Sequence, residues 1–322
     1  MAGSILEFVT GNKESSVGGE IPGAMTSQPR IILTGGSASL WWRHSPIEWA
    51  RKSPLGAFGL FLVLVIVMTA VSADWLAPYS PYEQNARALM RPPSIEHLMG
   101  TDNYGRDVFS RIVHGARISL AVGFSAILFS TLVGSALGIV SGYLEGKVDL
   151  VIQRFIDAKM AFPTIILATA ILAAFGPGLQ NVVLAIAVAG IAGSTRIVRS
   201  AVLKEKQSMY VDAARSLGCT DLRIMVAHIL PNVLAPIIVI ASVGVGSAIL
   251  LESALSFLGL GATEPNPSWG LMLTGGSRTY LIRAPWMAIF PGTAISLAVL
   301  GWNLFGDALR DTWDPRLRGL RS

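Results

Sequence analysis

The chain has 322 residues, of which 52% are hydrophobic and only 14% charged, and its formal net charge is +5. Soluble domains carry about 25% charged residues, so this composition excludes an ordinary soluble globule. Arginines gathered on one side of a membrane explain the basic balance better than nucleic-acid binding does, because the segments between them are strongly apolar. The single cysteine, Cys219, excludes an intrachain disulfide and a multi-cysteine metal site.

The first compact apolar run begins near residue 55, so the N-terminal part lacks the pattern of a signal peptide. Residues 1–38 are rich in glycine and serine and are expected to form a disordered cytoplasmic tail. Residues 39–54 hold tryptophans next to arginine and lysine, and this mixture is typical of a segment at the cytoplasmic membrane interface.

Six apolar runs follow, and a membrane-spanning helix needs about 20 such residues. They cover residues 55–73, 118–140, 160–176, 179–195, 233–251 and 284–306. The third and fourth runs are short and are separated by Gly176-Pro177-Gly178, so a re-entrant hairpin is an alternative to two spans. The pattern predicts an all-α integral membrane protein with a six-helix transmembrane domain over residues 55–309.

Lysine and arginine placement predicts the orientation. With six spans, three basic regions fall on one side, which should be the cytoplasm: residues 39–54, a loop at 196–232 and a tail at 310–322. Both termini are then cytoplasmic, and residues 77–117 and 257–283 are outer loops. The loop at 77–117 fits the rule poorly because it holds five arginines, which acidic residues nearly balance.

Acidic residues at two places in the chain are candidates for a catalytic, metal-binding or transport role. His97, Asp102 and Asp107 lie close together in the sequence, but no second cluster supports a catalytic or metal site, so a charge-paired structural loop at the outer mouth is preferred. Glu252 interrupts an apolar run, where an ionisable residue usually faces protein or water. It is expected either to line or brace a translocation path, or to lie at the interface bonded to Ser253 or Ser256.

Residues 210–231 form a polar, basic segment between the fourth and fifth runs. Tyr210, Ala213, Ala214 and Leu217 recur at helical spacing and predict one face of a short helix. Asp212 and Arg215 are three residues apart and can pair. Two adjacent alanines allow another backbone to come close. The segment is expected to dock on a partner protein or to lie on lipid headgroups.

Gly218 is expected to end this first helix, and Thr220 or Asp221 to cap a second one. The second helix repeats the apolar spacing with Leu222, Met225, Val226 and Ile229. Pro231 is expected to end it. The sequence thus predicts a helix–turn–helix between spans four and five.

The order Asp212-Ala213-Ala214, three residues, Gly218, and later Leu230-Pro231 resembles the EAA loop of ABC importer permeases. Asp212 stands where the family has Glu, and His228 stands where Ile is usual. The resemblance implies contact with the ATPase through coupling residues Tyr210, Asp212, Ala213, Ala214, Leu217, Gly218, Leu230 and Pro231.

Three further stretches resemble dipeptide/oligopeptide permeases of the DppC/OppC type. They are Met99 to Asp107 with the arginines that follow, Leu255 to Gly261 with Trp269-Gly270, and Gly306 to Asp311 with Asp314-Pro315-Arg316. The resemblance implies a type I ABC importer permease fold, with coupling helices between helices four and five. It also implies a heterodimer with a second permease, two ABC ATPase subunits at the cytoplasmic face, an external peptide-binding protein, and alternating access.

The leading hypothesis is a peptide importer permease in a prokaryotic plasma membrane. The chain has no Gly-x4-Gly-Lys-Ser/Thr loop, so ATP and Mg²⁺ are expected on partner subunits, with no catalytic, cofactor or metal residues here. The same transporter carrying glutathione or nickel complexes remains an alternative. An ion-coupled secondary transporter would need a proton or sodium site, for which only Glu252 is a candidate. An intramembrane hydrolase lacks its motifs.

Overall fold

The computed structural model describes residues 53–280 and 282–313, and this part of the chain is helical without any named strand. In chain order the helices are α2 (Pro54–Val71), α3 (Ala73–Leu76), α4 (Val108–Leu144), α5 (Gly146–Met160), α6 (Thr164–Phe175), α7 (Leu179–Glu205), α8 (Met209–Ser216), α9 (Asp221–Arg223), α10 (Leu230–Phe257), α11 (Trp269–Tyr280) and α12 (Trp286–Trp313). Two short turns complete the list, the 3₁₀ turn η2 (Ala86–Ala88) and the π-helical turn η3 (Ile224–Ile229). The predicted all-α class is confirmed, while the expected tail at 1–38, most of 39–54 and residues 314–322 lie outside the described residues.

Within residues 53–280 and 282–313, five continuous helical runs are long and apolar enough to cross a membrane: α2, α4, α7, α12 and the run from α9 through α10. The third expected span, at residues 160–176, is instead part of a bent pair, because α5 and α6 meet at 89°. Helix α6 has 12 residues, about 18 Å, and is too short to cross a 30 Å hydrocarbon core by itself. Pro163, which has no N–H to donate, lies at the break.

Several helices extend beyond the apolar runs that predicted them. Helix α4 begins at Val108, ten residues before the expected start of its span, and α7 continues to Glu205. The Asp107 side chain starts α4 by accepting the Ser110 N–H at 2.7 Å. Hydropathy marks only the turns that lie in lipid, whereas the backbone hydrogen bonds of a helix continue into the aqueous loops.

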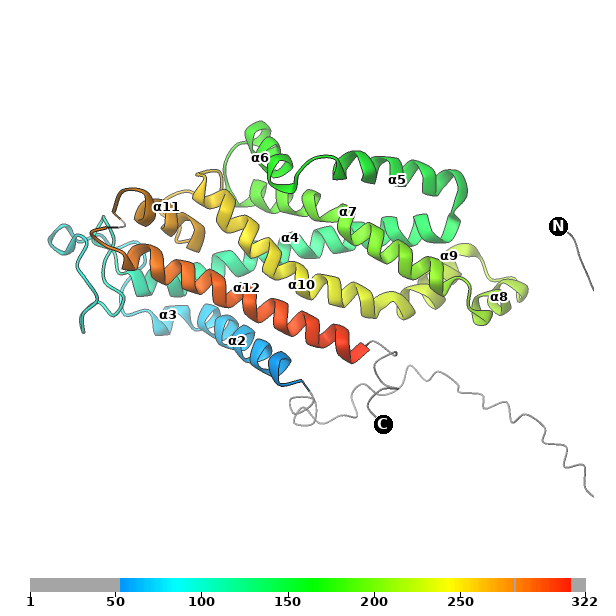
Figure 1. The fold of residues 1–322 in the computed structure, drawn as a ribbon, viewed down its shortest axis with the longest axis horizontal. Helices are drawn as coiled ribbons and strands as arrows, with labels where there is room; N and C mark the ends of the chain where they lie inside the picture. The colour runs from blue at the N-terminus through cyan, green and yellow to red at the C-terminus, as the bar shows by residue number, and fades with distance from the viewer. Residues whose placement is uncertain (1–52, 281, 314–322) are drawn as a thin grey trace, which may run out of the picture. The chain divides into compact units, whose positions relative to one another are not determined.

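Glycines at every fourth position of α4 let it pack closely against α7. A Cβ built on Gly134 would lie 2.6 Å from the Ser194 Cβ, and one built on Gly138 would lie 2.8 Å from the Thr195 carbonyl oxygen. Small residues at such an interface bring two backbones together in a membrane, where van der Waals contact is the main attraction between helices. Helix α4 also packs against α10, and α10 packs against α12. Helix α2 lies beside α12 (Figure 1).

Helix α11 is held against the start of α4 by Trp269. This side chain is 2% exposed, and its indole N–H donates to the Ile112 carbonyl at 2.9 Å. Gly115 makes room for the ring, because a Cβ there would lie 2.9 Å from it. The segment after α10 is thereby fixed to the first turns of α4, at the end of the helices where the loop before α4 also lies (Figure 1).

Candidate functional site

The segment between α7 and α10 is built around the short helix α8. The chain leaves α8 through a Schellman turn, in which the Cys219 N–H donates to the Ala214 carbonyl at 3.1 Å and the Gly218 N–H donates to the Arg215 carbonyl at 3.0 Å. Gly218 has φ = +81°, a conformation that glycine adopts without steric cost. The expected helix end at Gly218 and the pairing of Asp212 with Arg215, at 3.5 Å, are both present.

The second half of the predicted helix–turn–helix is not a separate helix, and that prediction is wrong. Helix α9, η3 and α10 form one continuous helical run from Asp221 to Phe257. Pro231 lies in the first turn of α10 and does not end a helix. A proline without an N–H interrupts the usual hydrogen-bond ladder, and the wider π turn just before it absorbs this interruption. Thr220 holds the N-cap position of α9 but makes no side-chain bond to it.

Helix α8 buries one side in the chain's own core. Val211 is fully buried and Ala214 is 6% exposed. Both belong to an apolar cluster of side chains from α4, α7, α8, η3 and α10: Tyr143, Val198, Val202, Val211, Ala214, Ile224, Ile229 and Val233. The single face predicted from Tyr210, Ala213, Ala214 and Leu217 is therefore divided, because helical spacing does not tell which side a neighbouring helix covers.

The other side of α8 is open. Met209 and Leu217 are 88% and 85% exposed, and Tyr210, Asp212, Ala213 and Gly218 are exposed beside them. Further along, Leu222 and Pro231 are exposed and Leu230 is half-buried. Large exposed apolar side chains on a helix that is otherwise well anchored are typical of a surface that contacts either a partner protein or a membrane.

Hydrogen bonds tie α8 and its neighbours to the ends of three long helices. The Tyr143 hydroxyl, from the end of α4, donates to Asp221 at 2.6 Å. The Tyr210 hydroxyl donates to Glu205 at 2.7 Å and accepts from Asn232 at 3.1 Å. Burial and the Glu205 carboxylate raise the pKa of Tyr210 to about 12, so the hydroxyl stays protonated as a donor at neutral pH. Sequence reasoning missed Tyr143 and Asn232, because they lie far from α8 in the chain.

Glu252 is fully buried in α10, where α4 faces it. Its carboxylate accepts hydrogen bonds from Ser256 at 2.8 Å, Ser119 at 3.3 Å and Ser253 at 3.4 Å. The local partners Ser253 and Ser256 were expected, and Ser119 from α4 is an addition. Glu252 thus bonds two helices to each other.

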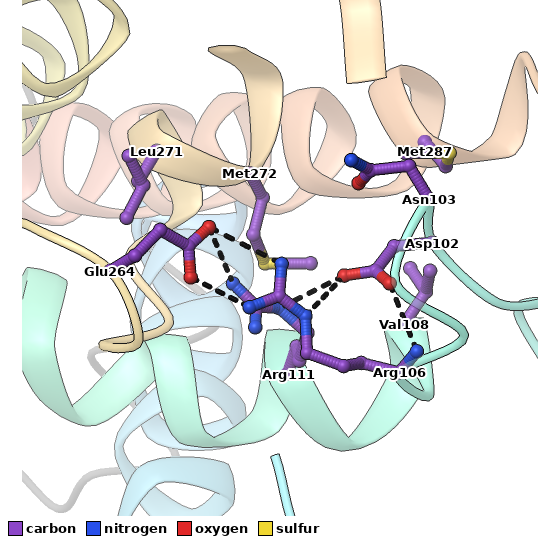
Figure 2. A pocket seen from close by; sticks show the side chains of 9 residues that line it. All are labelled: Asp102, Asn103, Arg106, Val108, Arg111, Glu264, Leu271, Met272 and Met287. Carbon is purple, nitrogen blue, oxygen red and sulfur yellow. Dashed lines mark hydrogen bonds and ion pairs between the residues drawn. The ribbon is translucent and has the colours of Figure 1, made fainter. Parts of the chain in front are cut away.

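A compact ion-pair cluster lies where the loop before α4 meets the loop after α10 (Figure 2). Arg106 bonds Asp102 at 2.6 Å and Glu264 at 2.6 and 3.2 Å. Arg111, which is 1% exposed, lies 3.8 Å from Asp102 and 3.9 Å from Glu264. Burial alone lowers the pKa of a guanidinium, but the Glu264 and Asp102 carboxylates raise the pKa of Arg106 above its usual value.

This cluster and its neighbour account for the acidic residues that the sequence singled out. Asp107 accepts from Ser110 and lies 3.0 Å from the Nδ1 of His97, while Asp102 is occupied by Arg106. Among the described residues, no group of three histidine, cysteine or acidic side chains is placed to hold a metal ion. Glu264, 158 residues from Arg106, carried no signal in the sequence that would have linked the two.

Comparison with known proteins identifies the family and the fold of the chain. Residues 134–319 match the family described as "Binding-protein-dependent transport system inner membrane component", and residues 50–93 match "N-terminal TM domain of oligopeptide transport permease C". The fold also matches a solved structure of the inward-facing MetNI methionine ABC transporter, with a TM-score of 0.54 at 18% identity over 64% of this chain and 98% of that chain.

Three curated relatives align along most of this chain. The dipeptide transport system permease protein DppC of Alkalihalophilus pseudofirmus is 44% identical, over 86% of this chain and 90% of the relative. The di/tripeptide transport system permease protein DppC of Pseudomonas aeruginosa is 42% identical, over 92% and 97%. The glutathione transport system permease protein GsiD of Pectobacterium atrosepticum is 43% identical, over 86% and 92%. The chain therefore belongs to the family of binding-protein-dependent transport system inner membrane components, in its DppC/OppC group.

Proposed function

We propose that this chain is one of two permease subunits of an ATP-driven peptide importer and forms half of its translocation path. The names of the relatives, two of which are dipeptide or di/tripeptide permeases, support the peptide as substrate. The partners are a second, different permease, two ABC ATPase subunits and an external peptide-binding protein. The α8 end of the molecule and both termini lie in the cytoplasm, where the ATPases bind.

The anchored, half-open helix α8 is the observation that carries this proposal. An isolated helix of eight residues is not stable in water, so α8 keeps its shape only through its contacts with the rest of the chain. Its buried side, at Val211 and Ala214, joins the ends of α4, α7 and α10. A force applied to the open side therefore passes directly into three membrane helices.

These connections support alternating access as the mechanism of the proposed importer. ATP binding closes the ATPase pair and moves α8 with it. Because α9, η3 and α10 form one run, a shift at Asp221 displaces α10, and the hydrogen bond from Tyr143 carries the shift to α4. The helices then change the side to which the path opens. ATP and Mg²⁺ bind to the partner subunits, and the chain itself performs no chemical step.

Replacing the exposed apolar side chains of α8 tests the docking. Each large side chain buried in a partner contributes about 1.5–3 kcal/mol. The double change Met209→Asp with Leu217→Asp is therefore expected to lower co-purification of the ATPase at least tenfold and to stop uptake, with membrane insertion unchanged.

The matched control is Ile95→Asp, which makes the same kind of substitution, with a single added charge, at a fully exposed isoleucine in the loop before α4. It should leave ATPase association at the wild-type level. Co-purification of the ATPase at full yield with the double α8 variant would contradict the docking and would favour binding of α8 to lipid headgroups.

Glutathione is a second candidate substrate within the same transporter class, because the GsiD relative is as similar to this chain as the dipeptide permeases are. Mass spectrometry of the ligand held by the binding protein of the purified complex distinguishes the two. A peptide other than glutathione supports the first proposal, and glutathione alone refutes it.

A further inference from the structure

Charged side chains connect α5 to α7 along much of α5. Three ion pairs cross between the two helices and the residues that flank them: Glu145 with Lys206, Asp149 with Arg199, and Asp157 with Arg196. Each pair lies further from α8 than the one before it. Each contains one acidic residue from the α5 side and one basic residue from the α7 side, so each pair is neutral.

The next charge along α5 breaks this order. Lys159 is half-buried and lies on α5, the side that supplies the acidic residue of each ion pair, but its own side chain is a cation. Its ammonium group donates to the carbonyl oxygen of Ala189 in α7. Within the part of the chain that the structure describes, no carboxylate lies within ion-pair distance of it. Lys159 is therefore a positive charge without a counter-ion in the described part of the chain.

This charge lies deep in the transmembrane part of the molecule. Ala189 comes ten residues after the start of α7, about 15 Å along the helix. That is about half of a 30 Å hydrocarbon core. A cation at this depth is costly against lipid and is found facing protein or water. The nearby Asp157 and Arg196 side chains are 50% and 47% exposed in this chain alone, so this face of α5 and α7 is open.

The helix that carries Lys159 ends one residue later. Helix α5 ends at Met160, and α6 turns away at 89° after Pro163 (Figure 1). Broken helices near the middle of the membrane are where transporters place sites for charged substrates. An open face, an uncompensated cation and a helix break thus coincide in the segment from Asp157 to Pro163.

We propose that Lys159 is a carboxylate-binding position on the translocation path and receives the terminal carboxylate of the peptide in transit. This assignment rests on the proposed peptide-import function. The ion pair of Asp157 with Arg196 neutralises its own two charges, so Lys159 supplies the positive charge of the site. The carbonyl of Ala189 orients the ammonium group and leaves its other N–H donors for the substrate.

The test compares uptake of a labelled dipeptide by the complete transporter in proteoliposomes with its ATP hydrolysis. Lys159→Met should lower uptake about tenfold, the order expected for one charge-assisted hydrogen bond, while assembly and ATP hydrolysis stay at the wild-type level. Lys159→Arg should retain most of the uptake. The matched control Lys147→Met removes an exposed lysine from the first turn of the same helix and should behave as wild type.

Wild-type uptake by the Lys159→Met complex would overturn the assignment of this lysine. A wild-type complex that imports no peptide with ATP present would instead contradict the proposed function, so the two failures are distinguishable. A water-soluble carbodiimide, which joins an amine and a carboxylate as an amide with loss of water, identifies the source of the carboxylate. Mass spectrometry should find Lys159 joined to the labelled dipeptide. A cross-link between Lys159 and the second permease would overturn the proposal that the substrate supplies the carboxylate.

Discussion

The close contact between α4 and α7 makes a quantitative prediction for Gly138→Ala. An added Cβ would lie 2.8 Å from the Thr195 carbonyl oxygen and 2.9 Å from the Val198 Cβ, while ordinary contact begins at 3.4 Å. The obstructing atoms belong to helix backbone and to a Cβ, so no side-chain rotation relieves the clash. Overpacking of this kind costs about 1–3 kcal/mol, and the better helix propensity of alanine returns at most about 1 kcal/mol. We expect the free energy of unfolding of the Gly138→Ala variant to fall by about 1–2 kcal/mol.

Gly193→Ala is the matched control on the facing helix. A Cβ at Gly193 meets nothing within 4 Å in this chain, so only the helix-propensity gain of about 0.5–1 kcal/mol remains. Thermal unfolding of the two purified variants in detergent, followed by the loss of monodisperse protein, should show opposite shifts. Equal melting temperatures for the two variants, or a more stable Gly138→Ala, would refute the close packing of α4 on α7.

Two further predictions concern acidic residues that bond two segments of the chain to each other. Asp102→Asn should lower the free energy of unfolding by about 3–5 kcal/mol. Asp102 is buried, and the loss of its charge leaves Arg106 and Arg111 with one carboxylate between them. Glu264→Gln should lower the free energy of unfolding by about 1 kcal/mol, since the Glu264 side chain is 47% exposed and water screens its ion pairs. Thermal unfolding of the two variants ranks these losses. A larger loss for Glu264→Gln than for Asp102→Asn would contradict the burial argument. We propose that Glu252 braces α4 against α10, so Glu252→Gln should assemble and transport at close to the wild-type rate in the proteoliposome assay. Loss of uptake by an intact complex would assign Glu252 to the path itself.

The segment at 210–231 illustrates what a local pattern can predict. Gly218 and the pairing of Asp212 with Arg215 depend on neighbours within a few residues, and both were predicted. The placement of Ala214 was not, because an apolar helical face can be covered by the chain's own helices or left for a partner. Val211, at a position outside the predicted face, is fully buried in the core.

The third span shows a different limit. Its apolar run was visible, but hydropathy sums residues along the chain and contains no direction, so the 89° turn at Pro163 was not predictable from it. Lys159 was overlooked for the same reason. Its meaning depends on the depth of Ala189 in α7 and on the acidic partners of the other ion pairs, and none of these is near it in the sequence.

The sequence by itself determined that the chain is a helical membrane protein, where its long helices lie and which segment resembles a coupling loop. These properties follow from composition, from the length of apolar runs and from spacing within one or two helical turns. Only the tertiary structure decided which side of α8 is open, that Glu264 completes a cluster with Arg106 and Arg111, and that Lys159 has no counter-ion among the residues described. The physical reason is that burial and charge pairing depend on distances between helices, and these distances are set by packing of residues far apart in the chain.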